Sequence, residues 1–415
     1  MRSPPKLLHN IAALGSVQVV GYLLPLISLP YVTRVLGVEA WGTLALVQVI
    51  LGYFSMFTNW GFGWSGTRKV AGVRDDHQKL SKVFMSIWAA QWALAAFAAL
   101  VLVVLILAVP FFRNNWLFYT YGIFGIFTTL LFPTWFLTGL ERMKQVAAIQ
   151  IGSRLVSLPL IFLFVQTPGD APLMIGIGVV TSLLGGIFTL LWIQKDTQLQ
   201  WQLPGWNQIF SELKESSSIF LSTIWIGLYT TLTPTILAIV AGPVAVGYYS
   251  LADKARQLAQ SAIAPISQAL FPRMSHLFKT DQAKARQLLF RSSKYIVAIS
   301  ACTSVTLWLL AEYAIILLAG EQFRPAVGVL HWLSPLPFIV SLSNIFGVQI
   351  MLPNHKTIAF TRILGAAGVL SLVLIYPLIV WQGATGASIN TLITECVVTI
   401  SMAIYIWRTG ILNEI

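Results

Sequence analysis

Charged residues are scarce in this sequence. Asp, Glu, Lys and Arg make up 10% of its 415 residues and hydrophobic residues 57%, whereas charged residues make up about 25% of an ordinary soluble domain. Largely apolar runs of about 20 or more residues recur along the whole length, and a helix of that length can cross a membrane. The runs lack the alternating polarity of membrane strands, which argues against a barrel. The sequence therefore predicts an all-α, multi-pass membrane protein.

Cysteines and catalytic motifs are also scarce. The two cysteines, Cys302 and Cys396, fall inside apolar runs, with no C-x-x-C or Cys/His spacing, which argues against a disulfide framework or a metal site. The motifs H-E-x-x-H, G-x-S-x-G and G-x-x-x-x-G-K-[ST] are missing. We therefore expect no metal, no cofactor, no catalytic residue and no direct use of ATP.

The apolar runs predict about twelve spanning helices in two six-helix lobes, residues 1–200 and 201–415. The first run is longer than the core of a signal peptide and has no clear cleavage site, so we interpret it as the first span. An even number of spans places both termini on one side of the membrane. The expected spans are residues 11–36, 41–63, 83–110, 116–138, 145–166, 172–194, 215–241, 245–271, 292–319, 325–351, 357–380 and 384–407.

Positive charge is unequally divided between the two sides of the membrane. Of the 26 lysine and arginine residues, three lie deep in expected spans, and only Arg34, Arg113 and Arg324 lie at the side opposite to the termini. The other twenty lie at the side of the termini, and cytoplasmic loops retain positive charge. We therefore expect an inner (plasma) membrane protein with both termini in the cytoplasm. The net charge of +12 then reflects topology, and we expect no nucleic-acid partner.

Connections on the outer side are very short, for example residues 37–40 and 320–324. An enzyme that handles sugars on the outer face usually needs a sizeable loop to build its site. The short connections therefore argue against a sugar polymerase or ligase.

A repeated pattern indicates an internal duplication. V-x-G-x-x-A-x-G occurs at residues 35–42 and again at 240–247, an offset of 205 that also places Arg68 on Arg273. Because six spans separate the copies, the two lobes have the same orientation, as in transporters with parallel repeats and a substrate path between the halves. Tight turns and close helix packing are the alternative explanation for each glycine alone.

Polar residues gather on one face of the eighth expected span, residues 245–271. Ser250, Asp253, Gln257, Gln260, Ala264 and then Ser267 or Gln268 follow steps of three and four, so they share one side of a helix. Lys254 and Arg256 lie near the outer end of this stripe. Asp253 can pair with Arg256, which leaves one positive charge unpaired. Such a face predicts the wall of a wet cavity, because ionisable groups at membrane depth are costly unless they face protein or water.

Other charged residues inside expected spans are further candidates. Arg154 lies near the middle of its span between Ser153 and Ser157, and Glu395 lies at a similar depth. Arg34 is close enough to a span end to reach the interface instead, and structural pairing between helices is the alternative for the rest. The candidate substrate-binding residues are Arg34, Arg154, Asp253, Lys254, Arg256, Gln257, Gln260 and Glu395.

Five segments resemble the O-antigen (Wzx-type) flippase family, within the superfamily of multidrug, oligosaccharidyl-lipid and polysaccharide exporters. The resemblance covers nearly the whole chain in order and is looser in the second half. The segments are SLPYVTRVLG (residues 28–37), residues 61–68, PTWFLTGLE (133–141), VGYYSLADK (246–254) and FPR (271–273).

The resemblance implies two six-helix lobes around a central cationic cavity. It also implies a substrate: an oligosaccharide such as an O-antigen repeat unit on an undecaprenyl pyrophosphate carrier, moved from the cytoplasmic to the periplasmic leaflet. We expect membrane lipids, and a polysaccharide polymerase, as partners. A multidrug or cation antiporter of the same superfamily is the main alternative; a peptidoglycan-precursor flippase would be expected to carry two further helices.

Overall fold

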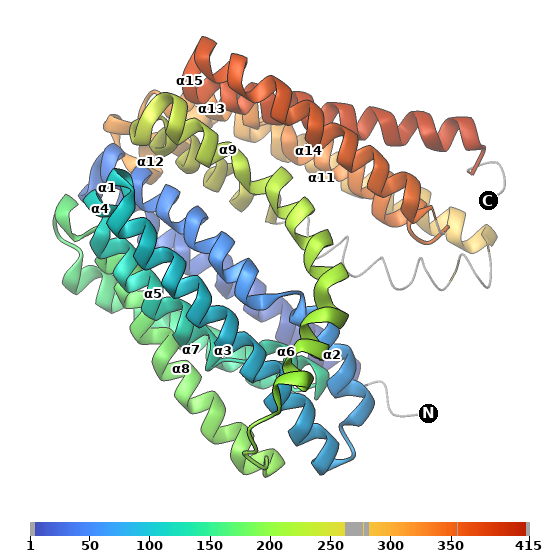
Figure 1. Cartoon of the computed structure of the whole chain (residues 1–415). Coiled ribbons are helices and arrows are strands. Elements are labelled where there is room, and N and C mark those ends of the chain that lie inside the picture. Colours follow the sequence, from blue (N-terminus) through green and yellow to red (C-terminus); the bar gives the residue numbers. More distant parts are fainter. Residues whose placement is uncertain (1–4, 262–276, 278–281, 355, 412–415) are drawn as a thin grey trace. The chain divides into compact units, whose positions relative to one another are not determined.

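The computed structural model describes residues 5–261, 277, 282–354 and 356–411. Every element of secondary structure in these ranges is a helix (Figure 1), which confirms the predicted all-α class. Contacts divide the chain into two compact units, Met1–Leu228 and Tyr229–Ile415. These units are defined by packing, whereas the expected lobes are defined by the repeat, so the lobe boundary at residue 200 stays a prediction.

The first unit is a bundle in which the long helices pack side by side (Figure 1). Helix α1 contacts α3, α5 and α7, and α8 contacts both α5 and α7. Its elements before α9 are α1 (Pro5–Asn59), α2 (Phe62–Val73), α3 (His77–Ala108), α4 (Pro110–Asn114), α5 (Trp116–Leu130), α6 (Thr134–Gly139), α7 (Met143–Phe164), the 3-10 helix η1 (Pro168–Asp170) and α8 (Leu173–Thr197).

Helix α9 (Trp206–Ser261) begins in the first unit and continues into the second, because the first unit ends at Leu228. Within the second unit, α15 contacts α13 and α14, and α14 contacts α11. Its further elements are α11 (Gln282–Leu309), α12 (Ala311–Ala319), the 3-10 helix η2 (Glu321–Phe323), α13 (Ala326–Leu333), α14 (Leu336–Asn344), the π-helix η3 (Ile345–Met351) and α15 (Thr357–Thr409).

Two long helices are broken at the glycines of the repeated pattern. Gly37 interrupts α1 at φ 71° and ψ 180°, and Gly242 interrupts α9 at φ 80° and ψ 177°. This backbone region is essentially restricted to glycine. The two repeat-related positions therefore share a conformation as well as a residue type, which supports the internal duplication.

The number of apolar helices agrees with about twelve spans. In the described part of the chain, eight helices are long and apolar enough to cross a membrane, and the pair α11–α12, bent by 70°, makes a ninth. Three of these contain a non-helical break, at Gly37, at Gly242 and at Gln382–Gly383. Counting each broken helix as two spans gives the predicted twelve.

Proline explains fewer of the breaks than its chemistry suggests. Pro159, Pro234 and Pro377 lie inside helices that continue past them. These helices therefore tolerate the loss of one backbone donor at each proline. Pro335, in contrast, lies between α13 and α14. The span expected at residues 325–351 is therefore divided at Pro335, and the span expected at 292–319 bends by 70° at Leu310 without a proline.

The first turn of α3 has a side-chain cap outside the apolar segment. The carboxylate of Asp76 accepts hydrogen bonds from the backbone N–H of Gln78 and of Lys79, each at 3.1 Å. These bonds and the Lys79 ammonium, 3.2 Å away, hold the pKa of Asp76 below its usual value.

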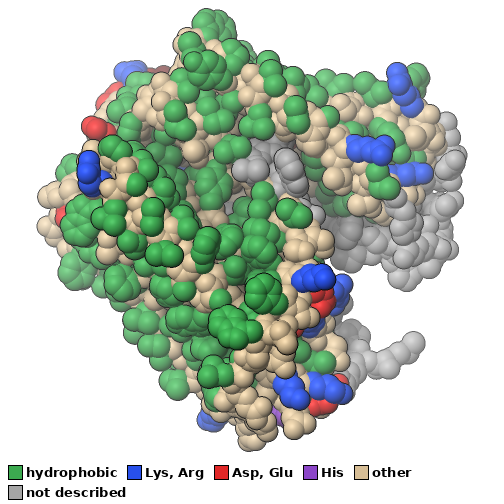
Figure 2. All heavy atoms as spheres, viewed as in Figure 1, with side chains coloured by type: hydrophobic (Ala, Val, Ile, Leu, Met, Phe, Trp, Pro, Cys, Tyr) green, Lys and Arg blue, Asp and Glu red, His purple; other side chains and the backbone are tan. Residues whose placement is uncertain are grey.

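Each unit has its own apolar core. Phe62, Phe84 and Phe136 are completely buried in the first unit, and Met351 and Met402 lie at the centre of the second. Many large hydrophobic side chains remain exposed, as expected of a surface that faces lipid. On the face of the first unit in Figure 2, hydrophobic side chains cover the middle and charged side chains lie towards the ends.

Part of the polar stripe and of the repeat lies outside the described residues: Ala264, Ser267, Gln268 and Arg273, with the segment 271–273. The chamber expected between the lobes stays a prediction.

Candidate functional site

The first unit contains a cavity of about 560 Å³, within the range of about 300–1,000 Å³ of small-molecule sites. Its lining comes from α1, α2, α3, α5, α6, α7, α8 and the α5–α6 connection. More than half of the lining residues are polar or glycine: Ser55, Thr58, Asn59, Gly63, Gln91, Thr129, Thr134, Gln150, Ser153, Arg154, Ser157, Gly178, Thr181, Ser182, Gly185 and Gly186.

Arg154 is the one lining residue of this cavity, among those described, that carries a charge. It lies on α7 and is accessible rather than enclosed by its neighbours. Arg154 makes no ion pair with a residue in the described part of the chain. Arg154 therefore lies at an accessible polar cavity within an apolar helix, and its role in substrate binding stays a prediction.

Helical spacing brings the polar side chains of α7 to the cavity. Gln150, Ser153, Arg154 and Ser157 follow steps of three, one and three, so they share one side of the helix. The Ser157 hydroxyl donates to the backbone oxygen of Arg154 at 2.8 Å. The Ser153 hydroxyl lies 3.5 Å from the backbone oxygen of Thr181 on α8.

A buried polar pair forms another part of the cavity lining. The indole N–H of Trp135 donates to the amide oxygen of Gln91 at 3.1 Å, and both residues are buried. This bond joins α3 to α6 and leaves the NH₂ group of Gln91 with both of its donors.

The candidate residues of α9 form one network in the second unit. Arg256 donates through Nε to Asp253 at 2.7 Å and also donates to Gln260. Gln257 donates to the other carboxylate oxygen of Asp253 at 2.7 Å. The predicted pair of Asp253 and Arg256 is confirmed. Lys254 also has an interaction partner.

Glu395 lies on α15, which a hydrogen bond joins to the same stretch of α9. The hydroxyls of Tyr249 and Thr391 are 3.2 Å apart. Asp253 follows Tyr249 by one helical turn and Glu395 follows Thr391 by one turn. Glu395 is half-buried and has an interaction partner.

Arg34 lies apart from the cavity lining. It is exposed on α1, one turn before the break at Gly37, and it has an interaction partner of its own. Among the candidates within the first unit, only Arg154 therefore lines the cavity.

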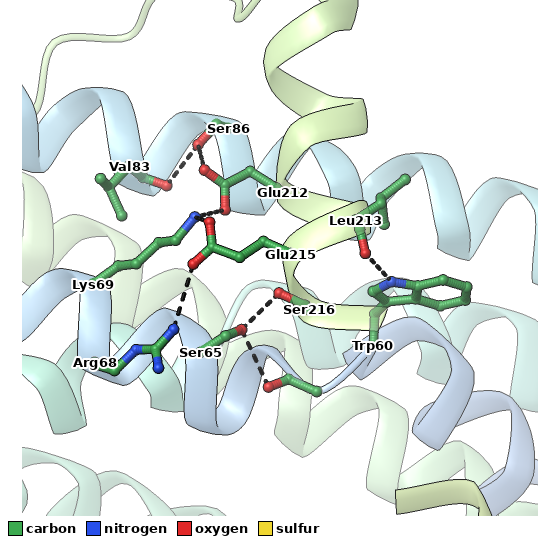
Figure 3. A network of polar contacts seen from close by, with 11 residues as sticks. Trp60, Ser65, Arg68, Lys69, Val83, Ser86, Glu212, Leu213, Glu215 and Ser216 are labelled. Carbon is green, nitrogen blue, oxygen red and sulfur yellow. Dashed lines mark hydrogen bonds and ion pairs between the residues drawn. The ribbon is translucent and has the colours of Figure 1, made fainter. Parts of the chain in front are cut away.

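A polar clamp fastens the start of α9 to the rest of the first unit (Figure 3). The Lys69 ammonium of α2 lies 2.7 Å from Glu212 and 2.7 Å from Glu215 of α9. The buried hydroxyls of Ser65 and Ser216 are 2.8 Å apart. The Trp60 indole donates to the backbone oxygen of Leu213 at 2.9 Å.

The sequence interpretation missed most of the polar cavity wall. The uncharged lining residues Ser55, Thr58, Asn59 and Gln91 carry no motif, and ordinary polar residues are common in membrane helices. Their signal is the spacing of Ser55, Thr58 and Asn59, which places them on one side of α1.

Comparison with known sequences gives a consistent set of relatives. Residues 7–278 match the family described as polysaccharide biosynthesis protein. A putative O-antigen transporter of Escherichia coli (strain K12) is 32% identical over 404 residues, which cover 97% of each chain. A putative O-antigen transporter of Shigella dysenteriae is 27% identical and covers 95% of this chain and 98% of its own length. These relatives are named as transporters, not enzymes.

Solved structures share the fold at low sequence identity. A multidrug resistance MATE family transporter of the MOP superfamily, in an inward-facing conformation, is similar at a TM-score of 0.74 and 14% identity, over 94% of this chain and 95% of its own. The lipid II flippase MurJ is similar at a TM-score of 0.66 and 12% identity, over 96% and 87%. These similarities establish the fold alone.

Proposed function

The chain belongs to the family of polysaccharide biosynthesis proteins, and we propose that it is a flippase. Its proposed substrate is an oligosaccharide, such as an O-antigen repeat unit, linked to undecaprenyl pyrophosphate. The protein moves this lipid from the cytoplasmic to the periplasmic leaflet of the inner membrane by alternating access. The names of its relatives support the substrate class.

The chemistry of the first-unit cavity carries the proposal. A pyrophosphate head is anionic, and a guanidinium presents several donors in a fixed geometry that suits phosphate oxygens. Arg154 is the one charged group among the described lining residues, and hydroxyls and amides surround it. Such groups replace water around sugar hydroxyls. The cavity therefore suits an anionic head with a polar glycan.

A drug or cation antiporter fits this cavity less well. A cationic cargo is favoured by carboxylates and by aromatic faces. Phe132 and Trp135 line this cavity, but no acidic residue is present among its described lining residues, and the one charged group there, Arg154, repels a cation. Asp253 and Glu395 remain candidates for coupling to a proton gradient, but Asp253 already accepts from Arg256 and Gln257.

The direction of transport follows from the proposed orientation. Basic loops and both termini lie in the cytoplasm under the positive-inside rule. An inside-negative potential favours outward movement of an anion by roughly 2.3 kcal/mol per charge for each 100 mV. A polymerase that consumes the flipped glycan is the expected partner.

Replacement of Arg154 tests the proposal. Arg154→Ala removes a charge-assisted hydrogen bond, and we expect transport to fall by about 10- to 100-fold, while Arg154→Lys keeps the charge and part of the activity. Transport is measured with a labelled lipid-linked glycan in vesicles, and surface polysaccharide in a strain lacking its own flippase. Arg113→Ala, an exposed arginine away from the cavity, is the matched control. Normal transport by Arg154→Ala would contradict the proposal.

A further inference from the structure

A second hollow lies beside the polar cavity, between α7 and α8. This groove of about 350 Å³ is lined by Ala148, Ile149, Gly152, Ser153, Val156, Thr181, Leu184, Gly185 and Phe188. Val156, Leu184 and Phe188 are exposed, so the groove opens on the apolar outer surface of the first unit. Its wall is apolar apart from two hydroxyls.

The groove and the cavity share a boundary. Ile149, Ser153, Thr181 and Gly185 line both. The boundary is thin because Gly185 has no side chain: an added Cβ there would lie 2.8 Å from the hydroxyl oxygen of Ser153. An apolar groove and a polar cavity with one guanidinium are therefore adjacent.

The position along the helices places the groove at membrane depth. Its α7 residues, 148–156, lie in the first half and middle of a helix that runs from Met143 to Phe164. Its α8 residues, 181–188, lie in the middle of a helix that runs from Leu173 to Thr197. Hydrocarbon is the expected surrounding at this depth.

We propose that this groove holds the prenyl chain of the lipid-linked substrate where the chain leaves the cavity, while the anionic head lies near Arg154. The inference rests on the proposed function. It makes the gap between α7 and α8 a lateral opening of the first unit, through which an amphipathic lipid keeps its chain in the bilayer.

An ordinary phospholipid fits the pair of sites less well than the substrate. Its headgroup stays at the membrane surface, near the helix ends, whereas the polar cavity lies beside the middle of α7 and α8. An occupant of both sites must hold its polar head in the cavity and its apolar chain in the groove, at the same depth in the membrane. A lipid that is being moved across the membrane meets this requirement. The cavity also offers a positive charge that complements a phosphate.

A larger side chain at Gly152 would fill the groove without changing the lining of the cavity. Gly152 lines the groove and not the cavity, and a Cβ added there meets no atom within 4 Å. Gly152→Leu therefore projects a side chain into the groove without a clash at its base. Gly365→Leu is the matched control, because Gly365 lies on α15, is exposed and also has open space at its Cβ position.

The experiment uses the full chain in vesicles of phosphatidylethanolamine and phosphatidylglycerol. The probe is a polyprenyl phosphate with a photoreactive diazirine in its chain, and labelled residues are identified by mass spectrometry. We expect labelling of Val156, Leu184 and Phe188. We expect it to fall about tenfold in Gly152→Leu, less in Gly152→Ala, and not at all in Gly365→Leu. Phe188→Ala, which widens the groove, should keep the label on Val156 and Leu184.

Three results would overturn the inference. One is equal labelling of the groove by a photoreactive phosphatidylglycerol, which would identify bulk lipid as the occupant. Another is unchanged labelling in Gly152→Leu, and the third is labelling confined to other helices. If the wild-type protein transports the labelled glycan while any of these holds, the flippase function stands and the groove does not. If the wild type fails to transport, the proposed function itself fails.

Discussion

Arg154 and Arg256 are both arginines in helices expected to span the membrane, but their surroundings differ. Arg256 is held by Asp253 and Gln260 on its own helix, with only 15% of its side chain exposed. Arg154 lines a cavity of hydroxyls and amides. A guanidinium that already has a carboxylate has less capacity left for an anionic ligand, so we assign the first contact with the substrate to Arg154.

The Asp253–Arg256 pair should contribute measurably to stability. Asp253→Ala leaves the partly buried guanidinium without its carboxylate, and losing the partner of a charged hydrogen-bonding group costs about 1–3 kcal/mol. We expect a clearly lower melting temperature in detergent, followed by tryptophan fluorescence. Asp253→Ala/Arg256→Met removes both charges and should recover most of the loss.

Equal melting temperatures for the single and double variants would contradict a stabilising pair. Transport by the double variant adds a second result. Loss of transport at a recovered melting temperature would favour contact of Arg256 with the substrate over a purely structural role.

At the scale of elements, two glycines set where the long helices change direction. Gly37 and Gly242 share a positive φ with ψ near 180°. In this region a Cβ is strained whatever space surrounds it. Both breaks therefore require a residue without a side chain, and at Gly242 the next residue is Pro243.

Alanine at Gly242 isolates this backbone effect. No atom lies within 4 Å of an added Cβ, so the cost is conformational, about 1–3 kcal/mol. We expect Gly242→Ala to lower the melting temperature in detergent. Gly365→Ala, inside α15, should change it in the opposite direction, because alanine favours a helix by about 0.5–1 kcal/mol over glycine. Two shifts of the same sign would contradict the argument.

The elements were largely predictable because apolar length and glycine pattern are local properties. The twelve spans follow from the length of the apolar runs, the repeat from one pattern found at two places in the sequence, and the Asp253–Arg256 pair from spacing along one helix. The bends were not predictable: Pro159 and Pro377 look like breaks and are not, while the 70° bend between α11 and α12 has no proline or glycine at Leu310. Whether a missing donor bends a helix depends on neighbouring helices, which the sequence pattern does not describe.

At the scale of the whole molecule, the cavity is a tertiary feature. Its wall combines Gln91 of α3, Arg154 of α7 and Thr181 of α8, and no periodicity links residues so far apart. Sequence reasoning therefore singled out Arg154 with Ser153 and Ser157 of the same helix, but not the lining residues of other helices or the adjoining groove.

The clamp between α2 and α9 leads to a prediction about movement. Ser65 and Ser216 belong to the same unit and their hydroxyls are 2.8 Å apart, so Ser65→Cys/Ser216→Cys should form a disulfide. Because the start of α9 is fastened to the first unit by Lys69, we expect cross-linked protein to transport normally.

Transport is measured in vesicles before and after reduction of the engineered disulfide. The variant also carries Cys302→Ser and Cys396→Ser. Transport that stops on oxidation and returns on reduction would mean that the start of α9 leaves α2 during the cycle.

The described cavity lies wholly within the first unit, because all of its lining residues fall between Ser55 and Gly186. On the proposed function, the contacts that distinguish one glycan from another are encoded in less than half of the chain, so substitutions within residues 55–186 alone should alter which glycan is accepted.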